Sequence, residues 1–159
     1  SERIYKTQIR VDTMNRKVCI RIKGLHDLGE ANPDEDGIEV IYVGTCYKRN
    51  GKYFIKYEGP REGTDEITEN MLKIASNEIE ITPKSETCTH MLFTRGQKNR
   101  IFYNTPFGPI NISVDTYDLN VVEEEDRLTA EIKYDLEINQ EAAFECRVNI
   151  EITSLEDNK

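Results

Sequence analysis

The feature that most constrains this chain is an alternation of apolar and polar residues with a period of two, which recurs from Val18 to Ile152. In the first such segment, Val18, Ile20 and Ile22 alternate with polar or small residues. This pattern gives a strand one buried and one exposed face. The 18 isoleucines and 8 valines far outnumber the 8 leucines and 5 alanines, and β-branched side chains suit a pleated surface. We therefore predict an all-β chain.

Turn signals separate these segments. Asn50-Gly51 is the strongest hairpin signal, because both residues readily adopt a positive φ. Asn139-Gln140 joins two long segments near the end of the chain, and the two prolines of the stretch 105–109 predict a corner rather than a central strand. The spacing of apolar residues in 67–74 is ambiguous between helix and strand. The expected strands are 18–23, 38–47, 52–58, 79–81, 87–94, 100–104, 110–114, 128–138 and 144–152.

Nine or ten strands with short connections favour sequential antiparallel pairing, and closing the sheet removes its exposed edges. We predict a single antiparallel up-and-down β-barrel, with an open sandwich as the alternative. The 159 residues suit one domain. We expect an N-terminal segment at 1–16, the barrel at 17–153 and a tail at 154–159, with Ser1 a processed or added residue.

The net charge of -9 disfavours partners that are polyanions, such as nucleic acid or an anionic membrane. It favours a basic protein partner instead. The sequence contains no apolar run of membrane-spanning length and no signal-peptide pattern at its start. We therefore expect a cytoplasmic protein that is a monomer or a homodimer.

The cysteines and histidines offer little chemistry. Cys19, Cys46, Cys88 and Cys146 are widely spaced, and the zinc-binding CxxC spacing does not occur. We expect buried or half-buried free thiols, with two disulfides in an exported protein as the alternative. Cys88 and His90 share one face of a strand, so a thiol-dependent enzyme remains a further hypothesis.

Two acidic stretches are interpreted as solvated turns. The stretch 32–37 begins like a calcium loop, but Val43 occupies the position where a bidentate Glu is needed. The stretch 123–126 carries four consecutive acids and is expected to form a solvated hairpin tip. We predict no metal site and no cofactor.

Aromatic and Met side chains are the best candidates for a binding site. Tyr53 and Tyr57 share one face of their strand, Met91 and Phe93 share one face of theirs, and Tyr103 lies on the strand that follows. These five side chains either fill a small barrel or line a pocket for an apolar or amphipathic ligand.

Three groups of residues resemble a known family. They are the run from Gly44 to Glu58, then 91–93 followed by Gly96, and 103–108 followed by Ile110 and Ile112. Over residues 17–153 the chain resembles the YwiB-like proteins, a family of uncharacterised bacterial β-barrels of the calycin (lipocalin-like) class. The resemblance implies a calycin barrel in the bacterial cytoplasm and carries over no catalytic residue.

The function expected from these observations is non-enzymatic binding of a small apolar or amphipathic ligand. Two alternatives stay open. The first is a protein-protein interaction module without a small ligand, and the second is the thiol-dependent enzyme.

Overall fold

The computed structural model describes residues 15–24, 39–60, 67–83, 90–141 and 143–155. These residues form strands and turns and contain no helix, so none of them belongs to a helix that could cross a membrane. The ten strands are β1 (Arg16–Lys23), β2 (Glu39–Arg49), β3 (Lys52–Pro60), β4 (Ile67–Ile74), β5 (Glu78–Pro83), β6 (Met91–Thr94), β7 (Gln97–Thr105), β8 (Gly108–Glu123), β9 (Arg127–Ile138) and β10 (Ala143–Ser154).

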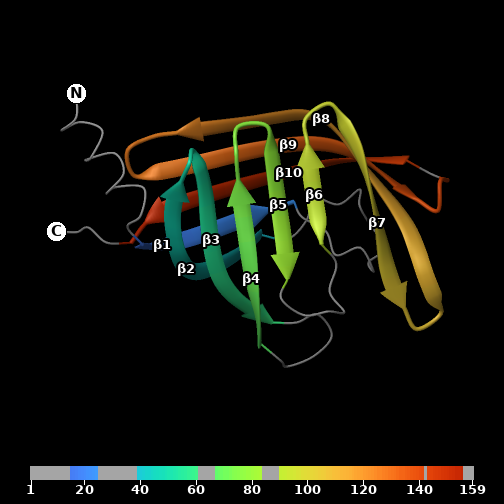
Figure 1. Cartoon of the computed structure of the whole chain (residues 1–159), viewed down its shortest axis with the longest axis horizontal. Helices are drawn as coiled ribbons and strands as arrows, with labels where there is room; N and C mark the ends of the chain where they lie inside the picture. The colour runs from blue at the N-terminus through green and yellow to red at the C-terminus, as the bar shows by residue number, and fades with distance from the viewer. Residues whose placement is uncertain (1–14, 25–38, 61–66, 84–89, 142, 156–159) are drawn as a thin grey trace.

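All ten strands belong to one antiparallel sheet that curls into a nearly closed barrel (Figure 1). The strand order is β6-β5-β4-β3-β2-β1-β10-β9-β8-β7. Strands that follow one another in the chain are therefore paired, except for β6 and β7, which lie at the two ends of this order. The pairing of β1 with β10 joins the first described strand to the last. The predicted all-β up-and-down barrel is thereby confirmed.

The Asn50-Gly51 turn has the backbone conformation that its sequence predicts. Asn50 and Gly51 have φ values of 54° and 78°, and Arg49 pairs directly with Lys52 across the turn. The last hairpin turns at Asn139 and Gln140, where φ is 54° and 63°. The register of β2 against β3 is thus determined by a local turn signal.

Three expectations for single segments need adjustment. Residues 67–74, ambiguous in sequence, form strand β4 because they pair on both sides with β3 and β5. Strand β8 continues well beyond 110–114, through an irregularity between Thr116 and Asp118. The corner at 105–109 is a tight turn, and Pro109 already lies in β8 opposite Asn104. Proline is tolerated there because the pairing of β8 with β9 begins only at Ile112.

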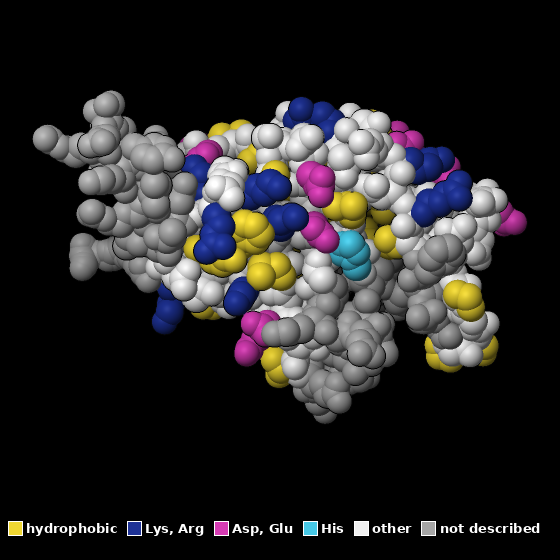
Figure 2. Space-filling view, in the orientation of Figure 1, with side chains coloured by type: hydrophobic (Ala, Val, Ile, Leu, Met, Phe, Trp, Pro, Cys, Tyr) yellow, Lys and Arg dark blue, Asp and Glu magenta, His cyan; other side chains and the backbone are white. Residues whose placement is uncertain are grey.

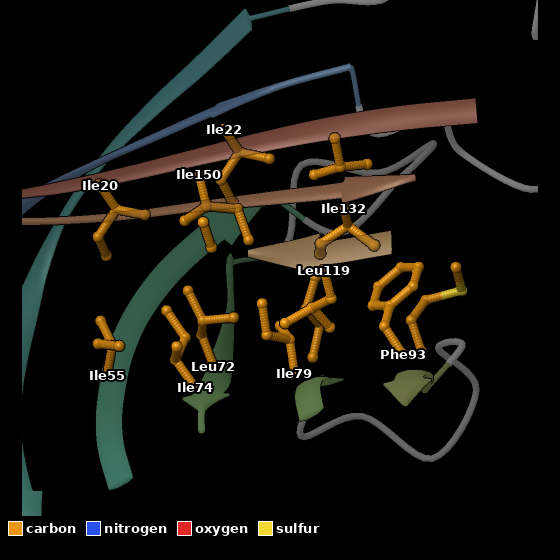
Figure 3. Packing of buried hydrophobic residues seen from close by; sticks show 14 of the residues in the cluster. Ile20, Ile22, Ile55, Leu72, Ile74, Ile79, Phe93, Leu119, Ile132 and Ile150 are labelled. Atoms are coloured by element: carbon orange, nitrogen blue, oxygen red, sulfur yellow. The ribbon is translucent and has the colours of Figure 1, made fainter. Parts of the chain in front are cut away.

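The middle of the barrel is filled by side chains from opposite walls. In Figure 3, Ile55, Leu72, Ile74, Ile79 and Phe93, from β3 to β6, point toward Ile20, Ile22, Leu119, Ile132 and Ile150, from β1 and β8 to β10. All ten side chains have relative exposures of 0–1%. The barrel is therefore packed at its centre, and a binding site has to be sought toward its ends.

Side chains, rather than a backbone ladder, bridge the seam between β6 and β7. The Asn99 side-chain amide of β7 donates to the Leu92 carbonyl at 3.2 Å and to the Thr94 hydroxyl at 3.1 Å, both in β6. The backbone N–H of Gly96, in the connection between the two strands, donates to the Thr116 carbonyl of β8 at 2.7 Å. These bonds complete the wall where strand pairing stops.

Candidate functional site

A cavity of about 200 Å³ lies at the end of the barrel where the β2–β3 hairpin meets the β8–β9 tip, the start of β1 and the end of β10. Its apolar lining includes Val18, Leu128 and Ile152, which also belong to the buried core. Cys46 and a set of charged and hydroxyl-bearing side chains line the rest, so the cavity combines an apolar floor with a polar rim. We call it the end cavity.

Lys48, Tyr53 and Glu123 form a hydrogen-bonded cluster in the wall of the end cavity. Lys48 and Tyr53 are directly opposite in the β2–β3 ladder, so the Asn50-Gly51 turn brings them together. The Glu123 carboxylate, at the end of β8, accepts hydrogen bonds from the Lys48 ammonium at 3.0 Å and from the Tyr53 hydroxyl. The Lys48 ammonium also lies 5.2 Å from the centre of the Tyr53 ring.

These contacts stabilise the charged form of Glu123. The hydrogen bond from Tyr53 and, next, the interactions with Lys48 hold the pKa of the Glu123 carboxyl below its ordinary value of 4.5, although partial burial opposes them. At neutral pH the cluster therefore contains an ionised carboxylate. It offers a ligand both hydrogen-bond acceptors and a positively charged donor.

Cys46 also lines the end cavity, with its thiol turned toward the core. Burial raises the pKa of the Cys46 thiol to about 11, and the nearby Arg16 lowers it only in part. Cys19, Cys46 and Cys146 are free thiols. Because Cys46 is protonated at neutral pH, it contributes to the cavity as a small apolar group.

The structure brings one of the five predicted binding residues, Tyr53, into the end cavity. Tyr57, Met91 and Phe93 lie in the packed core instead. The Tyr57 ring is centred 4.7 Å from that of Tyr42. Their part in contacting a ligand stays a prediction.

The structure describes Phe93 and Tyr103, the fifth predicted residue, to different extents. Phe93 is fully buried and its ring lies 4.9 Å from that of Tyr134, which confirms that it faces inward. The backbone of Tyr103 pairs with Ile110 in the β7–β8 ladder, and its side chain lies outside the described part of the structure.

Lys48 and Glu123 were missed in the sequence. Lys48 carried a usable signal, since it lies directly opposite Tyr53 in the predicted hairpin. Glu123 appeared only as one of four acids in a predicted tip. The tip itself is confirmed, with β8 ending at Glu123 and β9 starting at Arg127, but only the barrel shows that its first acid contacts the distant β2–β3 hairpin.

The remaining candidates for chemistry are only partly covered by the structure. Cys88 and the stretch 32–37 lie outside the described residues. His90 places its Nε2 atom 2.6 Å from a carboxylate oxygen of Glu80. Among the described residues no cluster of three or more His, Cys, Asp or Glu side chains is arranged to hold a metal ion.

Comparison with known proteins gives one family and one solved fold. Residues 20–150 match the model of a family described as "Domain of unknown function (DUF1934)". The crystal structure of the ywiB protein from Bacillus subtilis is similar to this chain, with a TM-score of 0.69 and 15% sequence identity, over 92% of this chain and 97% of that one. No curated protein sequence matches. The barrel and its strand arrangement are thus shared with a solved bacterial protein.

Proposed function

Since the chain belongs to the DUF1934 family of YwiB-like barrels, whose description assigns no activity, we propose a function from its own geometry. The barrel binds a small amphipathic ligand, without chemical conversion, in the end cavity. The observation that carries this proposal is the combination of an apolar floor at Val18, Leu128 and Ile152 with the polar Lys48–Tyr53–Glu123 cluster in one cavity.

The volume of the cavity limits the size of the ligand. A dry cavity of about 150 Å³ in another protein binds benzene, and ligand pockets generally have volumes of about 300–1,000 Å³. A cavity of about 200 Å³ therefore suits one aromatic ring with a small substituent, or a short aliphatic chain. Long-chain lipids are too large to be enclosed.

The hydrogen-bonding groups of the rim determine which polar group a ligand can carry. The Tyr53 hydroxyl and the Lys48 ammonium are donors, and the Glu123 carboxylate accepts from both. A ligand whose polar group hydrogen-bonds this cluster while its apolar end contacts the floor buries little unpaired polar surface. Calycin barrels often hold small apolar ligands, which supports the proposal as an analogy of fold.

Thermal denaturation with a panel of single-ring and short-chain alcohols, amines and carboxylates tests the proposal. At ten times its Kd, a ligand stabilises the folded state by about 1.4 kcal/mol, which raises the Tm of a domain of this size by about 3–5 °C. We expect at least one member to produce this shift. Tyr53→Phe should weaken ligands with a polar group more than it weakens the bare ring, because it removes the hydroxyl alone.

A cavity-filling variant locates the binding. Val18→Phe places a larger side chain into the floor and should abolish the shift. The matched control Val43→Phe makes the same change at a side chain that is 59% exposed on the outside of β2 and should leave it intact. Far-UV circular dichroism checks that both variants fold. The proposal fails if no compound stabilises the protein, or if Val43→Phe abolishes the shift and Val18→Phe does not.

A further inference from the structure

Basic side chains gather around two aromatic rings on the outer surface of the barrel, next to the end cavity, whose lining includes one of the two, Tyr47. Figure 2 shows Lys and Arg side chains surrounding hydrophobic ones over the area of β2 to β4. The residues are outward-facing members of β1, β2 and β3, and we call this surface the basic face: Lys17, Tyr47, Arg49, Lys52, Phe54 and Lys56.

Strand register places these side chains in three adjacent rows. Tyr47 pairs directly with Phe54 in the middle row, and their rings stack at 5.2 Å with 13° between their planes. Arg49 pairs with Lys52 in the row on one side. In the row on the other side, Thr45 pairs with both Lys17 and Lys56. The aromatic pair is thus flanked by cations at both ends.

The charges of Arg49, Lys52 and Lys56 are not neutralised by any residue of the described structure. Neither Lys52 nor Lys56 forms an ion pair with any described residue, and the described contact of the Arg49 guanidinium is with the Tyr47 ring, 5.8 Å from its centre. Arg49 and Lys52 are like charges in directly opposed positions, an arrangement that destabilises a sheet. An anionic partner would relieve this repulsion.

We propose that the basic face docks an extended acidic segment of a partner protein, with an apolar or aromatic side chain lying against Tyr47 and Phe54 between its carboxylates. Charge complementarity supports the choice, because Lys17, Arg49, Lys52 and Lys56 lie together on this face although the net charge of the chain is -9. Lys52 and Lys56 are four residues apart on β3, or about 13 Å at 3.3 Å per residue. An extended peptide covers this distance with carboxylates about four residues apart.

The surroundings of the basic face favour a peptide over nucleic acid. Glu58 pairs directly with Glu69 beyond Lys56, and β5, on the far side of β4, carries Glu78 and Glu80, of which Glu80 contacts Lys73 and His90. A single-stranded nucleic acid carries a phosphate at every nucleotide and would extend from the cations onto these carboxylates. A peptide can concentrate its charges where the cations lie.

Fluorescence anisotropy with labelled peptides tests the proposal on the intact chain. Each peptide carries two pairs of Glu separated by about four residues, with Trp, Leu or Ser at the centre. We expect the Trp and Leu peptides to bind more tightly than the Ser peptide. The charge-reversed Lys52→Glu/Lys56→Glu variant should weaken their binding by about tenfold or more, and higher salt should weaken it as well.

Two controls separate the outcomes. Arg100→Glu reverses an exposed cation on β7 and should leave binding unchanged. A short labelled oligothymidine tests the nucleic-acid alternative. Absence of peptide binding, binding that is insensitive to Lys52→Glu/Lys56→Glu, or tighter binding of the oligothymidine at the same face would each overturn the proposal. Ligands of the end cavity are expected to raise the Tm of the charge-reversed variant as much as that of the wild type. This test is therefore independent of the proposed function.

Discussion

Glu123 shows how one side chain joins distant segments of the chain. Its carboxylate is held by Tyr53 and Lys48, about 70 positions away in the sequence, and its side chain is still half exposed at 50%. Water screens such an interaction, so its contribution to stability is modest. Its importance lies in positioning the polar rim of the end cavity.

Glu123→Gln should make the free energy of unfolding less dependent on pH in the acidic range. The pKa of Glu123 is depressed in the folded state, so its contribution is present above the unfolded-state pKa and is lost as pH falls through the lower folded-state value. We expect the wild type to be more stable at pH 7 by at most about 1 kcal/mol. Urea denaturation between pH 7 and pH 3 should show the difference shrink below the ordinary carboxyl pKa of 4.5.

The control is Glu124→Gln, because no hydrogen bond or ion pair of the Glu124 side chain occurs within the described residues. If the difference in the free energy of unfolding between wild type and Glu123→Gln grew toward low pH, the contacts with Tyr53 and Lys48 would not stabilise the ionised carboxylate.

Cys46 should react with alkylating reagents far more slowly than an unfolded cysteine. Its pKa of about 11 against the ordinary 9.0 lowers the thiolate fraction at neutral pH on the order of 100-fold, and burial reduces access further. Iodoacetamide labelling followed by peptide mass spectrometry measures this, with half-buried Cys19 as an internal comparison. Labelling of Cys46 as fast in the native protein as in urea would contradict the buried position.

At the scale of strands and turns, glycine has two different roles in the β2–β3 hairpin. Gly51 provides a positive φ of 78° in the turn, where an added Cβ would have open space. Gly44 lies within strand β2 rather than in a turn, and a Cβ added there would meet the Lys56 carbonyl and the Tyr57 side chain of β3. The first glycine satisfies a backbone requirement and the second a close approach of two strands.

Gly44→Ala should therefore destabilise the fold more than Gly51→Ala. Alanine at position 51 costs about 1 kcal/mol for the left-handed conformation, whereas at position 44 the backbone of β3 has to move, which typically costs about 1–3 kcal/mol or more. Midpoints of urea denaturation measure both. Equal losses would mean that β2 and β3 adjust freely at Gly44.

At the scale of the whole molecule, stability depends on the packed centre and little on the tip at 124–126. Phe93→Ala removes a fully buried ring that packs against Tyr134 and should cost about 3–5 kcal/mol. Glu124→Ala changes an exposed side chain and should stay within about 0.5 kcal/mol. Urea denaturation, with a strand-dominated circular dichroism spectrum for both, checks the pair. A Phe93→Ala protein as stable as the wild type would contradict the packed barrel.

Local properties of the sequence were enough to predict most of the strands and the antiparallel pairing of strands that follow one another in the chain, although residues 67–74 stayed ambiguous. The alternation from Val18 to Ile152 identified the buried faces, and Asn50-Gly51 identified the register of one hairpin. Both signals act over a few residues, because side chains alternate with a period of two and a turn depends on the φ of its own residues. The acidic tip and the inward position of Phe93 followed from the same patterns.

Only the tertiary structure decided which ends of the strands meet and where space remains. The pairing of β1 with β10, the seam beside β6 and the contact of Glu123 with Lys48 depend on the accumulated twist and register of ten strands. For the same reason the aromatic residues of the sequence could not be divided in advance into core and cavity. Tyr57 and Phe93 pack in the core against side chains of the opposite wall. Tyr53, on the same face of β3 as Tyr57, lines the end cavity instead.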